Sequence, residues 1–214
     1  MTIAVPDAAY FQRVDRWSST PAYHREVDTL LAALDVQPGG RVLDVGCGPG
    51  AALRELRQRG ACPVGVDLYA AWANLCNERP VVRGDAGRLP FADGSMDAAL
   101  LVHVVAHLGR PAEGLKEIRR VLRPGGRLGL LTPNARFLSA LRLRPRRRRD
   151  YRPDPTVHHH YKLGELCRQV TAAGFRILQA RPWGARALPL PAASLKERLL
   201  LVAGAPDTST GRLR

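Results

Sequence analysis

Residues 42–50 read Val-Leu-Asp-Val-Gly-Cys-Gly-Pro-Gly, an apolar run that leads into three closely spaced glycines. The apolar run predicts a buried strand, and residues 51–59 place Leu53 and Leu56 on one face of a helix. Glycines permit a sharp turn and a close approach of ligand to backbone, because they lack a Cβ atom. The N-terminus of the following helix offers unpaired N–H groups to an anion. This segment therefore predicts a ligand that carries negative charge close to the backbone.

Strand and helix signals alternate along the rest of the chain. Short β-rich runs predict seven strands, at 41–45, 64–67, 81–83, 97–102, 127–132, 175–180 and 199–203. Helical patterns predict helices at 27–34, 51–59, 69–77, 111–122 and 164–173. Strands joined by helices require right-handed crossovers, so we expect an α/β fold with a doubly wound, mostly parallel sheet. Ligands bind such sheets at the carboxyl ends of the strands, where the strand order reverses.

Two segments fall outside this alternation. Residues 1–23 are rich in aromatic side chains and read as irregular, and we expect an N-terminal cap at 1–24 before a domain at 25–205. Residues 137–160 form a long basic insertion after the fifth strand. Loops of this length are uncommon unless they are lids or disordered. We expect a lid over the ligand end of the sheet, and a flexible tail at 206–214.

Composition narrows the class of protein. The chain has 214 residues, enough for one domain with a sizeable core. Its 33 basic and 19 acidic residues give a net charge of +14. No apolar run reaches the roughly 20 residues of a membrane span, and the N-terminus does not read as a signal peptide. The 4 cysteines fit neither a disulfide scaffold nor zinc spacing. We expect a cytoplasmic protein with no metal site and no membrane contact.

Three acidic residues distinguish between two possible ligands of the glycine bend. The bend itself satisfies the dinucleotide fingerprint G-x-G-x-x-G/A, which alone is a weak indication of NAD. Asp44, at the end of the first strand, would repel a pyrophosphate but attract an ammonium group. Asp67 ends the second strand, where it can accept hydrogen bonds from a ribose, and Asp85 follows the third strand, where it can accept one from an adenine amine. A zwitterion, a ribose and an adenine together describe S-adenosylmethionine, with NAD as the weaker alternative.

An ordered set of motifs resembles the class I S-adenosylmethionine-dependent methyltransferases, in the branch that includes ubiquinone-pathway O-methyltransferases. The motifs are residues 42–50, Val66-Asp67, GDAGRLPF at 84–91, the end of the fourth strand at His107-Leu108, RVLRPGG at 120–126, Thr132-Pro133-Asn134, His160-Tyr161-Lys162 and Ala173-Gly174-Phe175. The resemblance implies methyl transfer to a small molecule, to oxygen more than to nitrogen or carbon, and a place in specialised metabolism.

The resemblance also implies a role for each residue of the cofactor site. Asp44 and the glycine bend would hold the methionine end, and Asp67 the ribose. Leu68 would lie against the adenine, and Asp85 would read its edge together with Ala86. The complete set that the resemblance implies is Asp44, Gly46, Cys47, Gly48, Gly50, Asp67, Leu68, Asp85, Ala86, Leu101 and Val102.

His103 is the candidate catalytic residue. A sulfonium methyl group is already activated, so alignment of the acceptor supplies much of the catalysis and a general base is optional. His103 follows the buried fourth strand at the ligand end of the sheet, and histidine titrates near working pH. It is either a base or a hydrogen-bonded histidine of the pocket wall, whereas His107 is expected to pack locally.

The candidate acceptor site comes from both ends of the domain. Tyr10, Phe11, Trp17 and Tyr23 can form an apolar pocket for a planar substrate, unless they pack on the outside of the sheet. His158 and His160 can reach the acceptor from the lid. Adjacent histidines in a loop rarely converge on one ion, so we do not expect a metal.

Arginines concentrate at 142–152 and leave three interpretations open: a solvated loop, a clamp for an anionic acceptor, or a nucleic-acid contact. The fourth strand ends in Leu-Val-His and lacks the motif of base-amine methyltransferases, so a nucleic-acid partner is disfavoured. We expect a small-molecule substrate, anionic or aromatic. The alternatives are an RNA or protein methyltransferase and a non-catalytic protein that binds S-adenosylmethionine.

Overall fold

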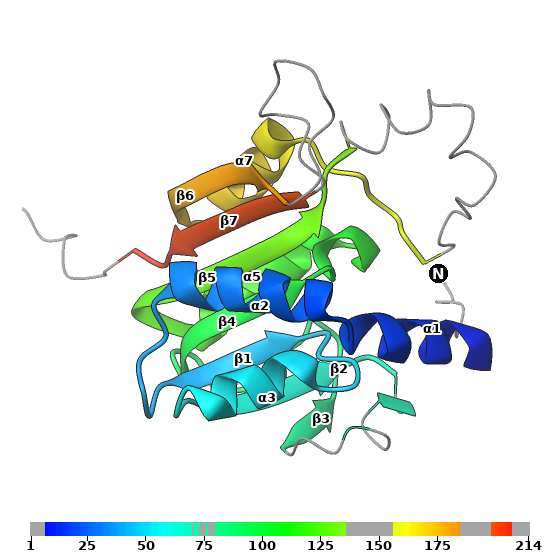
Figure 1. Ribbon diagram of the computed structural model, residues 1–214. Helices are drawn as coiled ribbons and strands as arrows, with labels where there is room; N and C mark the ends of the chain where they lie inside the picture. The colour runs from blue at the N-terminus through cyan, green and yellow to red at the C-terminus, as the bar shows by residue number, and fades with distance from the viewer. Residues whose placement is uncertain are drawn as a thin grey trace, which may run out of the picture.

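A seven-stranded sheet lies between two layers of helices in the computed structural model, which describes residues 7–69, 71–72, 76, 80–135, 156–184 and 198–206 (Figure 1). The strand order is β3-β2-β1-β4-β5-β7-β6. The strands are β1 (Arg41–Val45), β2 (Cys62–Asp67), β3 (Val81–Arg83), β4 (Met96–Val102), β5 (Leu122–Pro133), β6 (Arg176–Trp183) and β7 (Arg198–Gly204). The pairings from β3 to β5 are parallel, and β7 is antiparallel to both β5 and β6. The predicted doubly wound α/β fold is confirmed.

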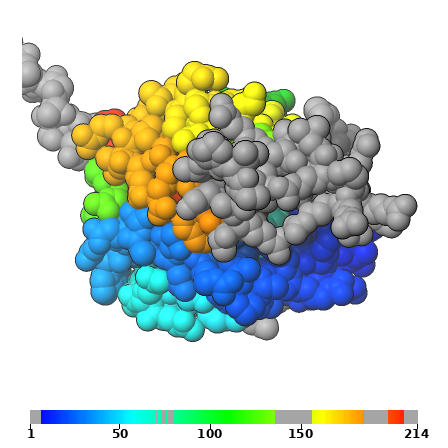
Figure 2. All heavy atoms as spheres, turned by 45° about the horizontal axis from the view of Figure 1, so that its top comes forward, coloured from blue at the N-terminus to red at the C-terminus, as the bar shows by residue number. Residues whose placement is uncertain are grey.

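Helices cover both faces of the sheet (Figure 1). They are α1 (Ala8–Ser18), α2 (Pro21–Leu34), α3 (Ala51–Gln58), the 3-10 turn η1 (Val105–His107), α5 (Pro111–Val121) and α7 (Leu163–Ala172). The apolar sides of α2 and α3 pack in one buried cluster on one face, while α5 and α7 belong to a second cluster on the other. The space-filling view shows the surface of β6, in orange, beside the blue surface of α2 (Figure 2).

The alternation of side chains along the central strands explains why both faces are covered. In β4, Leu100 and Val102 contribute to the cluster below α2, whereas Ala99 and Leu101 contribute to the cluster with α5. Every one of these four side chains is buried. A strand that is apolar on both sides must lie in the middle of a three-layer structure, because burial of each face requires its own layer.

The described part of the N-terminal segment is helical at 8–18 and from Pro21 on, so the prediction of an irregular segment was wrong for these residues. Asp7 caps α1 by accepting a hydrogen bond from the backbone N–H of Tyr10 at 2.8 Å. Thr20 caps α2 in the same way, with its hydroxyl 3.3 Å from the N–H of Tyr23 and with Pro21 in the first turn. These two caps were the available signals, because Asp and Thr before a helix satisfy its free N–H groups.

Several predictions fall mainly outside the described residues. They concern most of the helix at 69–77, most of the lid at 137–160 with its arginines, and the tail after residue 206. The boundaries of cap, domain and lid stay predictions. In the described part of the chain, no helix is both long enough and apolar enough to cross a bilayer.

The topology places a ligand site at the carboxyl end of β1. The strand order runs outward from β1 through β2 to β3 on one side and through β4 to β5 on the other, so this end is the switch point of the sheet. Figure 1 shows α1 beside the carboxyl ends of β1 and β2.

Candidate functional site

The bend after β1 is built by three glycines with positive φ. The φ angles are 73° at Gly46, 51° at Gly48 and 88° at Gly50, which caps α3. A Cβ atom at Gly46 would lie 2.4 Å from a methyl group of Val104, so this position accepts no larger residue. Among the described residues, no atom lies within 4 Å of a Cβ atom built at Gly48. Gly46 therefore packs tightly against the protein, whereas the described residues leave space beside Gly48. A ligand that contacts the backbone requires such a space.

Two buried carboxylates flank the bend. Asp44 is 2% exposed and Asp67 is 7% exposed. Asp67 accepts hydrogen bonds from the N–H of Gly48 and of Tyr69, each at 3.0 Å, and so ties the bend to β2. Burial, and then the nearby Asp67 carboxylate, raise the pKa of Asp44 to about 7. Two buried carboxylates repel one another, and a positively charged ligand would relieve that repulsion.

The segment after β3 places Asp85 and Ala86 at the same end of the sheet. Asp85 is exposed, and its Oδ1 accepts a hydrogen bond from the N–H of Gly87 at 2.8 Å, while Ala86 is buried. Cys47, Leu101 and Val102 are also buried, and Leu68 is half-buried.

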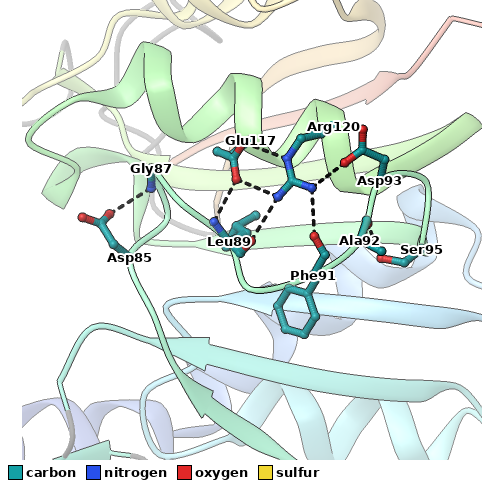
Figure 3. A network of polar contacts seen from close by, with 9 residues as sticks. All are labelled: Asp85, Gly87, Leu89, Phe91, Ala92, Asp93, Ser95, Glu117 and Arg120. Carbon is teal, nitrogen blue, oxygen red and sulfur yellow. Dashed lines mark hydrogen bonds and ion pairs between the residues drawn. The ribbon is translucent and has the colours of Figure 1, made fainter.

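Arg120 of α5 holds this segment in place (Figure 3). Its guanidinium donates to the carbonyl oxygens of Phe91 at 2.8 Å and Leu89 at 3.0 Å, and it pairs with Glu117 at 2.8 Å. Glu117 in turn accepts a hydrogen bond from the N–H of Leu89 at 2.9 Å. The segment that carries Asp85 is thus fastened to a helix of the core.

His103 lies at the carboxyl end of β4, next to the glycine bend through its neighbour Val104. Its φ of 61° is unusual for a residue other than glycine, and its N–H donates to the carbonyl of Leu131 at 2.7 Å. Such backbone conformations cost about 1–3 kcal/mol and concentrate at functional sites. Burial lowers the pKa of the His103 ring, although the adjacent Glu26 opposes that effect.

Glu26 connects His103 to β7, the strand that lies between β5 and β6. Its Oε2 lies 2.6 Å from Nε2 of His103, and its Oε1 lies 3.0 Å from Nε of Arg198 in β7. Burial raises the pKa of Glu26, but the hydrogen bond from His103 and the charges of His103 and Arg198 outweigh burial, so the net pKa is lowered. Neither Glu26 nor Arg198 was predicted from the sequence. The available signal was Glu26 itself, because it shares the buried face of α2 with Tyr23 and Leu30.

The four aromatic residues of the N-terminal segment separate into two groups. Trp17 packs edge-to-face on His103 and on Tyr23, each pair with ring centroids 4.7 Å apart. Phe11 instead packs against Tyr69 and Trp72, at 5.9 and 5.1 Å, after the end of β2, and the Tyr10 ring contacts Phe11 at 5.6 Å. Only Trp17 and Tyr23 adjoin the predicted catalytic residue.

The predicted lid histidines lie near η1. The N–H groups of His158 and His159 donate to the carbonyl of Ala106 at 2.9 and 3.0 Å, and the side chains of His158 and His160 are exposed. His107 contacts Thr156, with 2.8 Å from Nδ1 to Oγ1. No group of three metal-ligating side chains occurs among the described residues.

The methyltransferase-domain family matches residues 43–130, the segment from β1 to β5. An uncharacterized 37.1 kDa protein from a transposon of Streptomyces fradiae is 38% identical over 142 residues, which is 61% of this chain and 40% of that protein. Demethylmenaquinone methyltransferase of Corynebacterium kroppenstedtii is 42% identical over 97 residues, 44% of this chain and 42% of the relative. The chain thus spans less than half the length of these two relatives.

Structural comparison extends the likeness over the fold. A SAM-dependent methyltransferase from Aquifex aeolicus superimposes with a TM-score of 0.70 at 18% identity, over 94% of this chain and 100% of that chain. At that identity the superposition establishes the fold alone, and the match to the methyltransferase-domain family covers residues 43–130. This segment therefore resembles a methyltransferase domain, on a fold that the chain shares with SAM-dependent methyltransferases.

Proposed function

We propose that this protein transfers the methyl group of S-adenosylmethionine to a small-molecule acceptor, to oxygen in preference to nitrogen or carbon. The observation that carries the proposal is the bend whose Gly48 side is open beside two buried carboxylates, Asp44 and Asp67. Such a site suits a ligand with a cationic group and a carboxylate close to the backbone. The name of one relative, demethylmenaquinone methyltransferase, specifies a small-molecule acceptor and supports the same class here.

Each residue of the site has a distinct role in this proposal. The Asp44 carboxylate binds the ammonium of the methionine end, and the N–H groups of the bend bind its carboxylate. Asp67 accepts hydrogen bonds from the ribose hydroxyls, while Asp85 and Ala86 contact the edge of the adenine. When bound, the cofactor supplies a sulfonium methyl group that is already activated.

His103 and the aromatic pair Trp17 and Tyr23 form the acceptor side. The rings exclude water and orient a planar acceptor, and His103 takes the proton that an acceptor hydroxyl loses. Alignment of two reactants can supply about 7–11 kcal/mol of the barrier reduction, and a general base adds roughly 10²- to 10⁴-fold in rate.

Calorimetry tests the cofactor assignment. We expect S-adenosylmethionine and S-adenosylhomocysteine to bind with one site per chain, and NADH to give no heat of binding. Asp67→Ala should weaken binding by 10-fold or more, because a charge-assisted hydrogen bond contributes about 1.5–3 kcal/mol. Asp28→Asn, at a half-exposed residue of α2 that pairs with Arg59, is the control and should bind as the wild type does. Tight binding of NADH, or no binding of either S-adenosyl compound by folded protein, would contradict the proposal.

A further inference from the structure

We propose that Glu26, paired with Arg198, is the positioning residue for His103. It holds the ring in the form that is protonated at Nε2. Nδ1 is then the atom that accepts a proton from an acidic hydroxyl of the acceptor. The inference rests on the proposed methyl transfer and deepens it, because it identifies the basic atom and the class of acceptor.

The contacts of the Glu26 carboxylate carry the first step. Both of its oxygens are engaged, one with Nε2 of His103 at 2.6 Å and one with Nε of Arg198 at 3.0 Å. The side chains of His103 and Glu26 are 10% and 6% exposed, so water competes little for either group. Arg198 compensates the charge of Glu26, which keeps the carboxylate ionised and makes it a hydrogen-bond acceptor only.

The form of the ring follows from that pairing. An ionised carboxylate can only accept, so Nε2 must carry the proton, and a neutral imidazole then has its lone pair on Nδ1. Within the described residues, the contacts of the His103 ring are those with Glu26, Trp17 and Tyr23, and none of them is a hydrogen bond to Nδ1. Nδ1 therefore has no hydrogen-bond partner among the described residues.

Backbone geometry supports a role beyond packing. His103 has a φ of 61°, a conformation that glycine adopts without strain and histidine does not. Val104, the next residue, sits against Gly46 of the cofactor bend. The ring is thus fixed at the boundary between the cofactor bend and the aromatic pair.

The chemistry specifies the acceptor. The acceptor oxygen forms a bond to the methyl carbon while the carbon–sulfur bond breaks and its electron pair stays on sulfur. The hydroxyl proton passes to Nδ1, and the imidazolium that forms is stabilised by the Glu26 carboxylate. A neutral imidazole can take a proton from a phenol, whose pKa is about 10 as in tyrosine, far more readily than from an aliphatic alcohol. The acceptor is therefore a phenolic or enolic hydroxyl.

The ring form can be measured without turnover. Long-range proton–nitrogen NMR of nitrogen-15-labelled full-length protein, with His103→Asn to assign the signal, should show His103 protonated at Nε2 and bare at Nδ1 near pH 7.5. A wild-type ring protonated at Nδ1 would overturn the inference. The groups that can alter the titration of His103 are Glu26 from α2, Arg198 from β7 and His107 from η1, and the Tyr23 ring also faces it.

Turnover tests the role of the carboxylate. Release of S-adenosylhomocysteine should be faster with 1-naphthol than with 1-naphthalenemethanol as the acceptor probe. Glu26→Gln should lower kcat for the naphthol by about 10²-fold with little change in KM for S-adenosylmethionine, and should move the acidic limb of the pH profile to lower pH. Equal rates with the two probes, or a Glu26→Gln enzyme with wild-type kcat, would overturn the inference.

A matched variant separates this effect from a general loss of stability. Glu55 pairs with Nδ1 of His24 at 2.9 Å, away from His103, so Glu55→Gln removes the same charge from a second Glu–His pair and should leave kcat unchanged. The two proposals also fail separately. Absence of cofactor binding removes the methyltransferase proposal, whereas cofactor binding together with a reversed ring form removes only this inference.

Discussion

At the scale of single residues, Asp44 makes the stability of the free protein depend on pH. Its pKa is raised to about 7 in the folded protein, above the value of about 3.9 in an unfolded chain. The folded state therefore binds this proton more strongly, and stability is lost as the pH rises from about 4 to about 7. Asp44→Asn should flatten this dependence and raise the free energy of unfolding at pH 8 by as much as about 4 kcal/mol. Urea denaturation at several pH values measures the free energy of unfolding of both proteins. Parallel pH profiles for the wild type and Asp44→Asn would contradict the prediction.

The same carboxyl links cofactor binding to a proton. If Asp44 binds the ammonium of the cofactor, binding lowers its pKa and releases a proton near pH 6.5. Calorimetry in phosphate and in Tris should then give different apparent enthalpies for the wild type and equal ones for Asp44→Asn. Equal wild-type enthalpies in the two buffers would show that Asp44 does not face the cation.

Gly46 and Gly48 of the bend should differ sharply in the stability that is lost when each is changed to alanine. Both have positive φ, so each substitution carries about 1–2 kcal/mol of backbone strain. At Gly46 the new methyl group would also lie 2.4 Å from Val104, so Gly46→Ala should unfold at a markedly lower temperature. At Gly48 the space is open, so Gly48→Ala should stay folded but bind S-adenosylhomocysteine more weakly. Thermal unfolding and calorimetry measure the pair, and equal losses of stability would show that the neighbouring space does not matter.

At the scale of elements, α5 fixes the segment that follows β3. Arg120 contacts two backbone carbonyls there and pairs with both Glu117 and Asp93 (Figure 3). Arg120→Ala should lower the free energy of unfolding by about 1–3 kcal/mol, because it leaves charge-assisted hydrogen bonds unmade. Asp93→Ala is the control: its side chain is 80% exposed, so its loss should cost about 0–1 kcal/mol. Equal losses in urea denaturation would show that the backbone contacts contribute nothing.

At the scale of the whole molecule, β7 completes the sheet from the end of the chain. It lies between β5 and β6 and pairs with both, and Leu199 to Ala203 are buried. A chain that ends after Trp183 should fail to fold, because β5 and β6 lose their shared partner and the core loses one strand. A chain that ends after Pro206 keeps β7 and should remain soluble. Soluble yield and far-ultraviolet circular dichroism compare the two, and a folded shorter chain would contradict the role of β7.

Elements were predictable wherever one local pattern was enough to specify them. The strands at 41–45 and 81–83 were placed at their observed bounds, and β4 and α5 within one residue. The early start of β5 at Leu122 was missed, because Pro124 and the glycines after it read as a turn. The cap helix α1 was missed for a similar reason, since its N-cap signal was weaker than its irregular mixture of aromatic and charged residues.

The sequence by itself determined the bend, its acidic neighbours and the α/β class. These features depend on the conformational freedom of glycine and on side-chain periods of two and 3.6, which act between close neighbours in the chain. Only the tertiary structure decided that Glu26, His103 and Arg198 meet. They belong to α2, the end of β4 and β7, and their contact depends on strand order and on the register of antiparallel β7 against β5. Long-range packing of this kind leaves no local signal beyond one glutamate on the apolar face of a helix.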